Sequence, residues 1–179
     1  MKTKIIVLTI ITMFAVTAMS FLLKPDYTKS SVSFKIKNAG IGVNGTFKTF
    51  ETSIDFNEAF NGPSYIKATI QVESIDTGIE GRDNHLRKEE FFNMAVYPTI
   101  TFESTKIRKN TNGSFNADGK LKIKDVTKDV SIPFTYTGTA ASGVFEGTLE
   151  LNRLDYGVGG KSATMSNDVA VTLKVTTSR

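Results

Sequence analysis

The sequence of 179 residues has no cysteine, no tryptophan and one histidine, His85. A chain without cysteine forms no disulfide and cannot carry the lipid anchor of a bacterial lipoprotein. Zinc sites take three or four ligands, so a single histidine would leave nearly all of them to carboxylates. We therefore expect no metal site and no cofactor, and a fold that depends on its apolar core alone.

Motifs of the common enzyme classes are missing as well. No G-x-S-x-G segment marks a hydrolase nucleophile, and Gly157–Gly160 matches neither the dinucleotide-binding loop nor the Walker phosphate loop. A hydrolase that pairs His85 with a distant serine is the weakest hypothesis that stays open. We expect that the protein is not an enzyme and that Gly157–Gly160 is a loop between strands.

Long apolar runs are absent except near the N-terminus. Lys2 and Lys4 precede the apolar run Ile5–Val16, and Ala18-Met19-Ser20 then fits a cleavage site before Phe21. This order is typical of a signal peptide, and the run is short for a membrane span. We expect residues 1–20 to direct export and residues 21–179 to form one periplasmic domain. Cleavage after Ala18 and a retained N-terminal anchor are the alternatives.

No long run of one charge sign follows. Two of the 22 basic residues precede residue 21, which leaves 20 basic against 18 acidic residues in the remaining chain. A nucleic-acid surface needs a concentrated basic stripe, so we expect no nucleic-acid partner.

From Tyr27 onward, apolar residues alternate with polar ones, and β-branched and aromatic residues are frequent. A period of two with one apolar face is typical of antiparallel strands. Short turns rich in Asn, Gly, Asp and Ser separate the segments. The pattern predicts eight strands, within residues 30–37, 42–56, 64–75, 99–105, 119–126, 130–136, 143–153 and 168–175.

Within the second segment the apolar phase shifts between Phe47 and Phe50, which predicts a β-bulge near Lys48–Glu51. Eight sequential antiparallel strands form either a sandwich or a closed up-and-down barrel. The thirteen Phe residues could fill such a core. A barrel of this size is either filled by its side chains or holds one small ligand, and periodicity does not separate the two.

Residues 77–97 lose the alternation. Thr77-Gly78-Ile79-Glu80 fits a capping box, and Ile79 and Leu86 would share one helical face. We expect a short helix between the third and fourth strands, with Pro98 opening the strand that follows.

Arg153 continues the inward phase of its strand, so its charge points toward the core. An isolated buried charge is costly and needs a partner. Two interpretations stay open. Arg153 either contacts the anionic or polar head group of a ligand, or it is a rim arginine paired with Asp76, Asp83 or Asp155.

Residues 74–105, SIDTGIEGRDNHLRKEEFFNMAVYPTITFEST, closely resemble the signature of the YceI-like family of bacterial periplasmic proteins. The shared elements are S-I-D-T, R-D-x-H-L, F-F and Y-P-x-I-x-F-x-S. The segments SSVSFKIK, GTFKTFETSIDF, DGKLKIKDVTKDVSIPF, LNRLDYGVG and SNDVAVTL fit in the same order, so the resemblance covers nearly all of residues 21–179. Members often have histidine where this chain has Asn38.

The resemblance implies an all-β, lipocalin-like, eight-stranded antiparallel barrel with one helical insertion. It also implies an elongated apolar tunnel that binds polyisoprenoid chains, quinone tails or fatty-acid amides. Members are associated with stress responses and can form homodimers. The residues expected along the tunnel are Phe34, Ile36, Phe47, Ile70, Val72, Leu86, Phe91, Phe92, Ile100, Phe102, Ile132, Phe134, Leu149 and Leu151. Those expected at its mouth, near a head group, are Asp76, Arg82, Asp83, His85 and Arg153.

The leading hypothesis is therefore a non-enzymatic binding or carrier protein for a polyisoprenoid or another long-chain lipid. The alternative is a stress-related interaction module with a filled barrel core and no bound lipid. The alternative predicts an interior without a tunnel and an exposed apolar patch.

Overall fold

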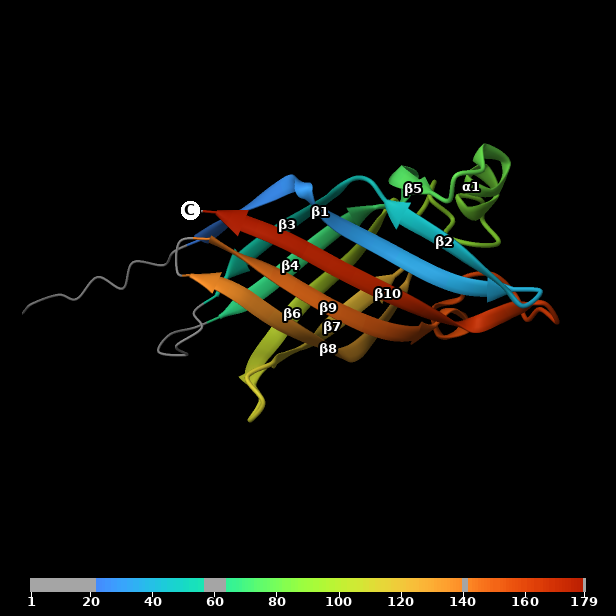
Figure 1. Cartoon of the computed structure of the whole chain (residues 1–179). Helices are drawn as coiled ribbons and strands as arrows, with labels where there is room; N and C mark the ends of the chain where they lie inside the picture. The colour runs from blue at the N-terminus through green and yellow to red at the C-terminus, as the bar shows by residue number, and fades with distance from the viewer. Residues whose placement is uncertain (1–21, 57–63, 140–141, 179) are drawn as a thin grey trace, which may run out of the picture.

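A computed structural model of the chain describes residues 22–56, 64–139 and 142–178 (Figure 1). The predicted signal peptide, residues 1–20, lies outside the described residues. The elements are β1 (Leu22–Asn38), β2 (Ile41–Phe47), β3 (Phe50–Asp55), β4 (Tyr65–Gln71), the 3-10 turn η1 (Val72–Ser74), β5 (Ile75–Asp76), α1 (Glu80–Leu86), β6 (Thr99–Lys109), β7 (Phe115–Ile123), β8 (Val126–Thr139), β9 (Ser142–Asn152), the 3-10 turn η2 (Arg153–Tyr156) and β10 (Met165–Ser178).

The sheet closes into a barrel because its first and last long strands pair. The order around the ring is β10-β9-β8-β7-β6-β4-β3-β1, and β1 pairs antiparallel with β10. β2 and β3 follow each other along the other edge of β1, with β2 against Val32–Asn38 and β3 against Leu22–Leu23. They act as one strand of the ring, so the predicted eight-stranded antiparallel barrel is confirmed.

The predicted bulge in this strand is a two-residue break. Lys48 and Thr49 separate β2 from β3, and their backbone groups bond to Ser74 and Gln71 instead of β1. The break restores the inward phase, since Phe47 and Phe50 on either side are both buried.

Alternation in the sequence gives each strand its buried face. In β7 the odd-numbered residues from Phe115 to Ile123 are all buried, and the residues between them are more exposed. Gly119 is the small member of that face: a Cβ there would lie 2.3 Å from the carbonyl oxygen of Glu103. The close approach coincides with a register shift in β6 between Ser104 and Lys106, where glycine in a strand is expected.

The helix between the third and fourth strands of the ring is confirmed, but its predicted capping is wrong. α1 begins at Glu80 with Ile79 in extended conformation as N-cap, and no side chain caps it. Thr77 directs its hydroxyl to Asp83 instead. Ile79 is 55 % exposed because it precedes the helix, so it shares no buried face with Leu86. None of the helices in the described part of the chain is long and apolar enough to cross a membrane.

The two ends of the barrel differ. At one end the ring of Phe56 contacts four others, with centroid distances between 5.0 and 5.9 Å. We call this cluster the aromatic plug; it consists of Phe56, Phe115, Phe134, Tyr136 and Phe145. The opposite end, which we call the mouth, is surrounded by the β1–β2 turn, α1 and residues 153–164 (Figure 1).

We expect Phe115→Ala to lower the free energy of unfolding by about 3–5 kcal/mol, the usual cost of deleting a buried Phe side chain. Phe115 is 1 % exposed and stacks on Phe134. Urea unfolding measures the change. Ile41→Ala is the control, because Ile41 is 71 % exposed and should cost less than about 0.5 kcal/mol. Equal losses in the two variants would contradict a structural role for the plug.

Candidate ligand-binding cavity

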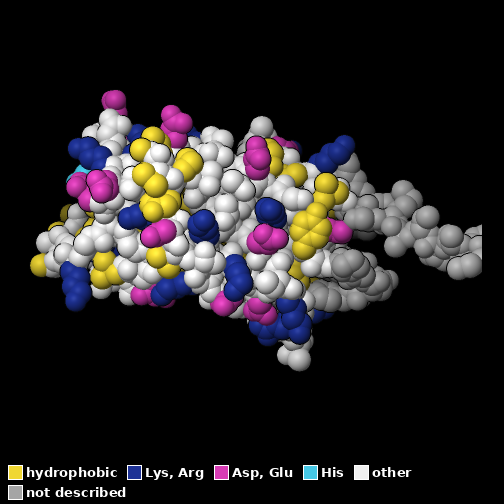
Figure 2. All heavy atoms as spheres, turned by 180° about the vertical axis from the view of Figure 1, so that it is seen from behind, with side chains coloured by type: hydrophobic (Ala, Val, Ile, Leu, Met, Phe, Trp, Pro, Cys, Tyr) yellow, Lys and Arg dark blue, Asp and Glu magenta, His cyan; other side chains and the backbone are white. Residues whose placement is uncertain are grey.

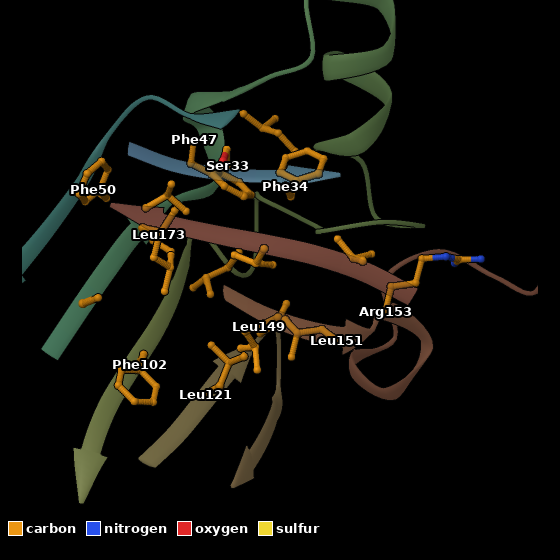
Figure 3. A pocket seen from close by; sticks show the side chains of 18 of the residues that line it. Ser33, Phe34, Phe47, Phe50, Phe102, Leu121, Leu149, Leu151, Arg153 and Leu173 are labelled. Carbon is orange, nitrogen blue, oxygen red and sulfur yellow. The ribbon is translucent and has the colours of Figure 1, made fainter. Parts of the chain in front are cut away.

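The barrel encloses a cavity of about 290 Å³. Inward side chains of all eight strands of the ring line it, and Leu86, Phe91 and Phe92 of the insertion cover it at the mouth. Figure 3 shows apolar side chains that converge on the cavity from two sides of the ring, with Phe34 and Phe47 on one side and Phe102 and Leu121 on the other. Few polar groups reach its wall, as in cavities that bind apolar molecules.

All but one of the residues expected along the tunnel lie on the cavity wall. The exception is Val72, which is buried at 1 % exposure but does not line the cavity. It belongs to η1, where the strand alternation ends, and its backbone N–H donates to the carbonyl of Pro98. Val72 therefore packs in the core beside the cavity.

The expected set also missed part of the wall. β10 contributes an apolar stripe whose alternation was visible in the sequence, and the mouth adds side chains from the turn and loop regions. The missed residues include Val169, Val171, Leu173 and Val175 of β10, and Asn38, Val43, Tyr156, Val158 and Met165 near the mouth.

Charge on the wall is confined to two arginines. Among the described residues that line the cavity, Arg82 and Arg153 are the only charged ones, and no Asp or Glu is present. Both belong to the mouth, Arg82 on α1 and Arg153 at the start of η2. The cavity is thus apolar over most of its length and cationic at one end.

Arg153 is held by neutral groups. Its Nε donates to the carbonyl of Ser166 and its Nη1 to the carbonyl of Val158, both at 2.9 Å. Its Nη2 is buried without a hydrogen-bond partner, and the residue is 6 % exposed. Burial lowers the pKa of the Arg153 guanidinium below its ordinary value, because desolvation penalises the charged form.

The acidic partners predicted for Arg153 are all engaged elsewhere. Asp76 pairs with Lys48, and Asp155 pairs with Lys128 at 2.9 Å. Asp83 accepts hydrogen bonds from the backbone and side chain of Thr77. The rim interpretation of Arg153 as one half of an ion pair is therefore wrong, because all three carboxylates are committed to other donors.

Arg82 is positioned through Thr77. Its Nε donates to the Thr77 hydroxyl and its Nη2 to the Thr77 carbonyl, both at 2.7 Å. The same hydroxyl donates to Asp83, which is 6 % exposed. Nη1 of Arg82 has no partner among the described residues. Asp83 thus fixes Thr77, and Thr77 fixes Arg82, a residue of the cavity wall, while leaving its Nη1 without a partner.

Three of the residues expected at the mouth, Asp76, Asp83 and His85, do not line the cavity, and Asp83 acts there only through Thr77. Asp76 lies outside it, where Lys48 and then the Gly78 N–H lower the pKa of its carboxyl group. The side chain of His85 is 52 % exposed and contacts Glu90. His85 also packs edge-on against Phe91 at 5.0 Å, so it braces a lining residue from outside. No group of three or more His, Cys, Asp or Glu that could hold a metal ion occurs in residues 22–56, 64–139 and 142–178.

The Gly157–Gly160 loop closes over Arg153. Gly159 has φ +69 and donates its N–H to the carbonyl of Glu90 at 2.9 Å. A Cβ on Gly159 would lie 2.8 Å from the Phe91 ring and 2.9 Å from Nη1 of Arg153. The predicted loop is therefore confirmed. Only glycine fits at position 159, where the loop contacts the insertion at the mouth of the barrel.

Comparison with known proteins identifies the fold. Residues 23–177 match the model of the YceI-like domain. The chain belongs to the YceI-like domain family. A UPF0312 protein of Azotobacter vinelandii is 30 % identical over 88 % of this YceI-like chain and 86 % of its own length. A UPF0312 protein of Pseudomonas aeruginosa is 33 % identical over 80 % and 78 % of the two chains.

Solved structures share the YceI-like barrel. Burkholderia cenocepacia BcnA has a TM-score of 0.81 at 27 % identity and covers 86 % of this chain and 99 % of its own. A polyisoprenoid binding domain from Saccharophagus degradans has a TM-score of 0.67 at 15 % identity, over 87 % of this chain and 97 % of its own. At that identity the second likeness shows a common fold.

We expect Asp83→Ala to loosen the mouth of this YceI-like barrel. The variant leaves the Thr77 N–H and hydroxyl without their acceptor, which should lower the free energy of unfolding by about 1–3 kcal/mol. Hydrogen exchange at the Thr77 amide should become faster while exchange in β9 and β10 stays slow. Glu89→Ala, an exposed change on the same insertion, is the control. Unchanged exchange at Thr77 in Asp83→Ala would contradict the positioning role.

Proposed function

We propose that the protein binds a long-chain amphiphile, with the apolar tail inside the barrel and the head group at the mouth. The observation that carries the proposal is the distribution of polarity along the cavity. Its wall is mostly apolar between the aromatic plug and the mouth, where Thr52 adds one buried hydroxyl, and its only described charges, on Arg82 and Arg153, lie at the mouth. An amphiphile has the same arrangement, one long apolar part and one polar end.

Energetics favour an occupied cavity. Each methylene of a tail that moves from water into this apolar cavity contributes about 0.8 kcal/mol to binding. The filled-core alternative disagrees with this cavity.

A polyisoprenoid is one tail that suits the site. Family membership supports an apolar ligand of this kind, and a structural neighbour is described as a polyisoprenoid binding domain. The rings and branched side chains on the wall suit the methyl branches of a prenyl chain, and they suit a fatty acyl chain as well. The proposal is therefore a polyisoprenoid or another long-chain lipid as ligand.

The role we propose is non-enzymatic binding or carriage in the periplasm. His85 lies at the surface beside Glu90 and outside the cavity, so the geometry gives no reason to place a reaction there. Residues 1–20 have the pattern of an export signal. An intact mass that matches a chain starting at Phe21 would support export with cleavage, and a mass that includes Met1 would oppose removal of residues 1–20.

We expect Ala68→Phe to weaken ligand binding at least tenfold while keeping or raising stability. Ala68 lines the cavity and pairs with Phe102 on the neighbouring strand β6, so a ring at position 68 would project into the cavity and occupy space that the ligand needs. Binding is measured by fluorescence titration with N-phenyl-1-naphthylamine, and stability by thermal unfolding. Lys67→Phe places the same ring on the outer face of β4 as a control. Equal affinity in the two variants would contradict binding inside the barrel.

A further inference from the structure

We infer that the head group bound at the mouth is acidic: a carboxylate or phosphate at the end of an apolar tail, held by Arg82 and Arg153. This inference rests on the proposed function and adds the chemical class of the head group. The alternative is a neutral head group, such as a quinone ring, an amide or an alcohol.

The first argument is uncompensated charge. Arg153 is nine-tenths buried, its two hydrogen bonds go to backbone carbonyls, and its Nη2 has no partner. Neither Arg153 nor Arg82 forms an ion pair with any residue in the described part of the chain. Two cations at the end of an apolar cavity stabilise an anion there strongly, because the surroundings screen the interaction weakly.

The second argument is the geometry of Arg82. Thr77 occupies its Nε and Nη2, and Asp83 in turn fixes Thr77, so the side chain is ordered before a ligand arrives. The nitrogen that has no partner, Nη1, belongs to a residue on the cavity wall. A planar guanidinium with a free donor suits the oxygens of carboxylate and phosphate, and prior ordering lowers the entropic cost of that contact.

The third argument is the contrast with the outer surface. Acidic and basic side chains are interspersed over the face of the molecule seen in Figure 2. On the cavity wall the two described charges have one sign. A preference for an acid is therefore expected of the cavity, since the mixed charges on the face seen in Figure 2 offer no comparable field.

Three ligands with one tail and different heads test the inference: dodecanoate, dodecyl phosphate and dodecanol. Each is titrated against N-phenyl-1-naphthylamine bound to the full mature chain at pH 7.5, below its aggregation concentration. We expect dodecanoate or dodecyl phosphate to bind at least tenfold more tightly than dodecanol. The tighter of the two acids identifies the head as a carboxylate or a phosphate.

Variants assign the effect to the two arginines. Arg82→Gln should reduce the preference for the acid over dodecanol to about threefold or less, chiefly through weaker binding of the acid, and Arg153→Gln should do the same. Because Arg153 also holds Ser166 and Val158, Arg82→Gln keeps the test decisive if the other variant unfolds. Lys161→Gln is the control: it removes one charge from an exposed residue near the mouth that does not line the cavity.

The two proposals fail in different ways. If none of the three ligands displaces the probe, the proposed function is overturned. If dodecanol binds as tightly as both acids, tail binding stands and the acidic head group is overturned. A preference that survives in Arg82→Gln and Arg153→Gln but falls in Lys161→Gln would also overturn it, because general surface attraction would then be its source.

Discussion

The pairing of β1 with β10 is the constraint on which the rest of the structure depends. Without it the sheet would have two open edges, and its apolar face would need another layer to cover it. With it, the eight strands form a ring, and alternate side chains of each strand must share one interior. Neighbouring strands cannot move apart to suit side chains that are too large or too small. The volume inside the ring that these side chains do not fill is therefore set by the sequence.

That interior is used unequally along the barrel axis. Five aromatic rings fill one end, whereas the middle and the mouth are left as a cavity closed by Phe91, Phe92 and Leu86. The mouth also contains the polar network of the molecule's interior, Asp83 to Thr77 to Arg82, and the buried Arg153. A site that recognises the polar head group of a molecule with an apolar tail needs rigid hydrogen-bond donors at the edge of an apolar cavity.

Much of this arrangement could be predicted from the sequence. A period of two places Phe102, Phe134 and Leu149 inside, and the same phase carries Arg153 inward, as the structure has it. Loss of that period marked the insertion. Predictions from local patterns were wrong for residues whose position depends on tertiary contacts. Val72 has the right phase but sits in a 3-10 turn, and His85 has the right neighbours but faces solvent.

The open cavity itself could not be predicted in this way. A filled and a hollow barrel have the same alternation, and the difference depends on summed side-chain volumes around a closed ring. The bond between Thr77 and Asp83 likewise needs the turn between β5 and α1, which replaces the expected capping box. Resemblance to a family supplied the expectation of a tunnel that residue patterns alone left undecided.

Native mass spectrometry of protein isolated without detergent from the cells that make it tests the central claim most directly. We predict a complex whose excess mass belongs to one long-chain amphiphile, released on mild activation. The claim that this barrel binds a ligand in its cavity would be contradicted by protein that carries no such mass and takes up neither prenyl nor acyl amphiphiles when they are added.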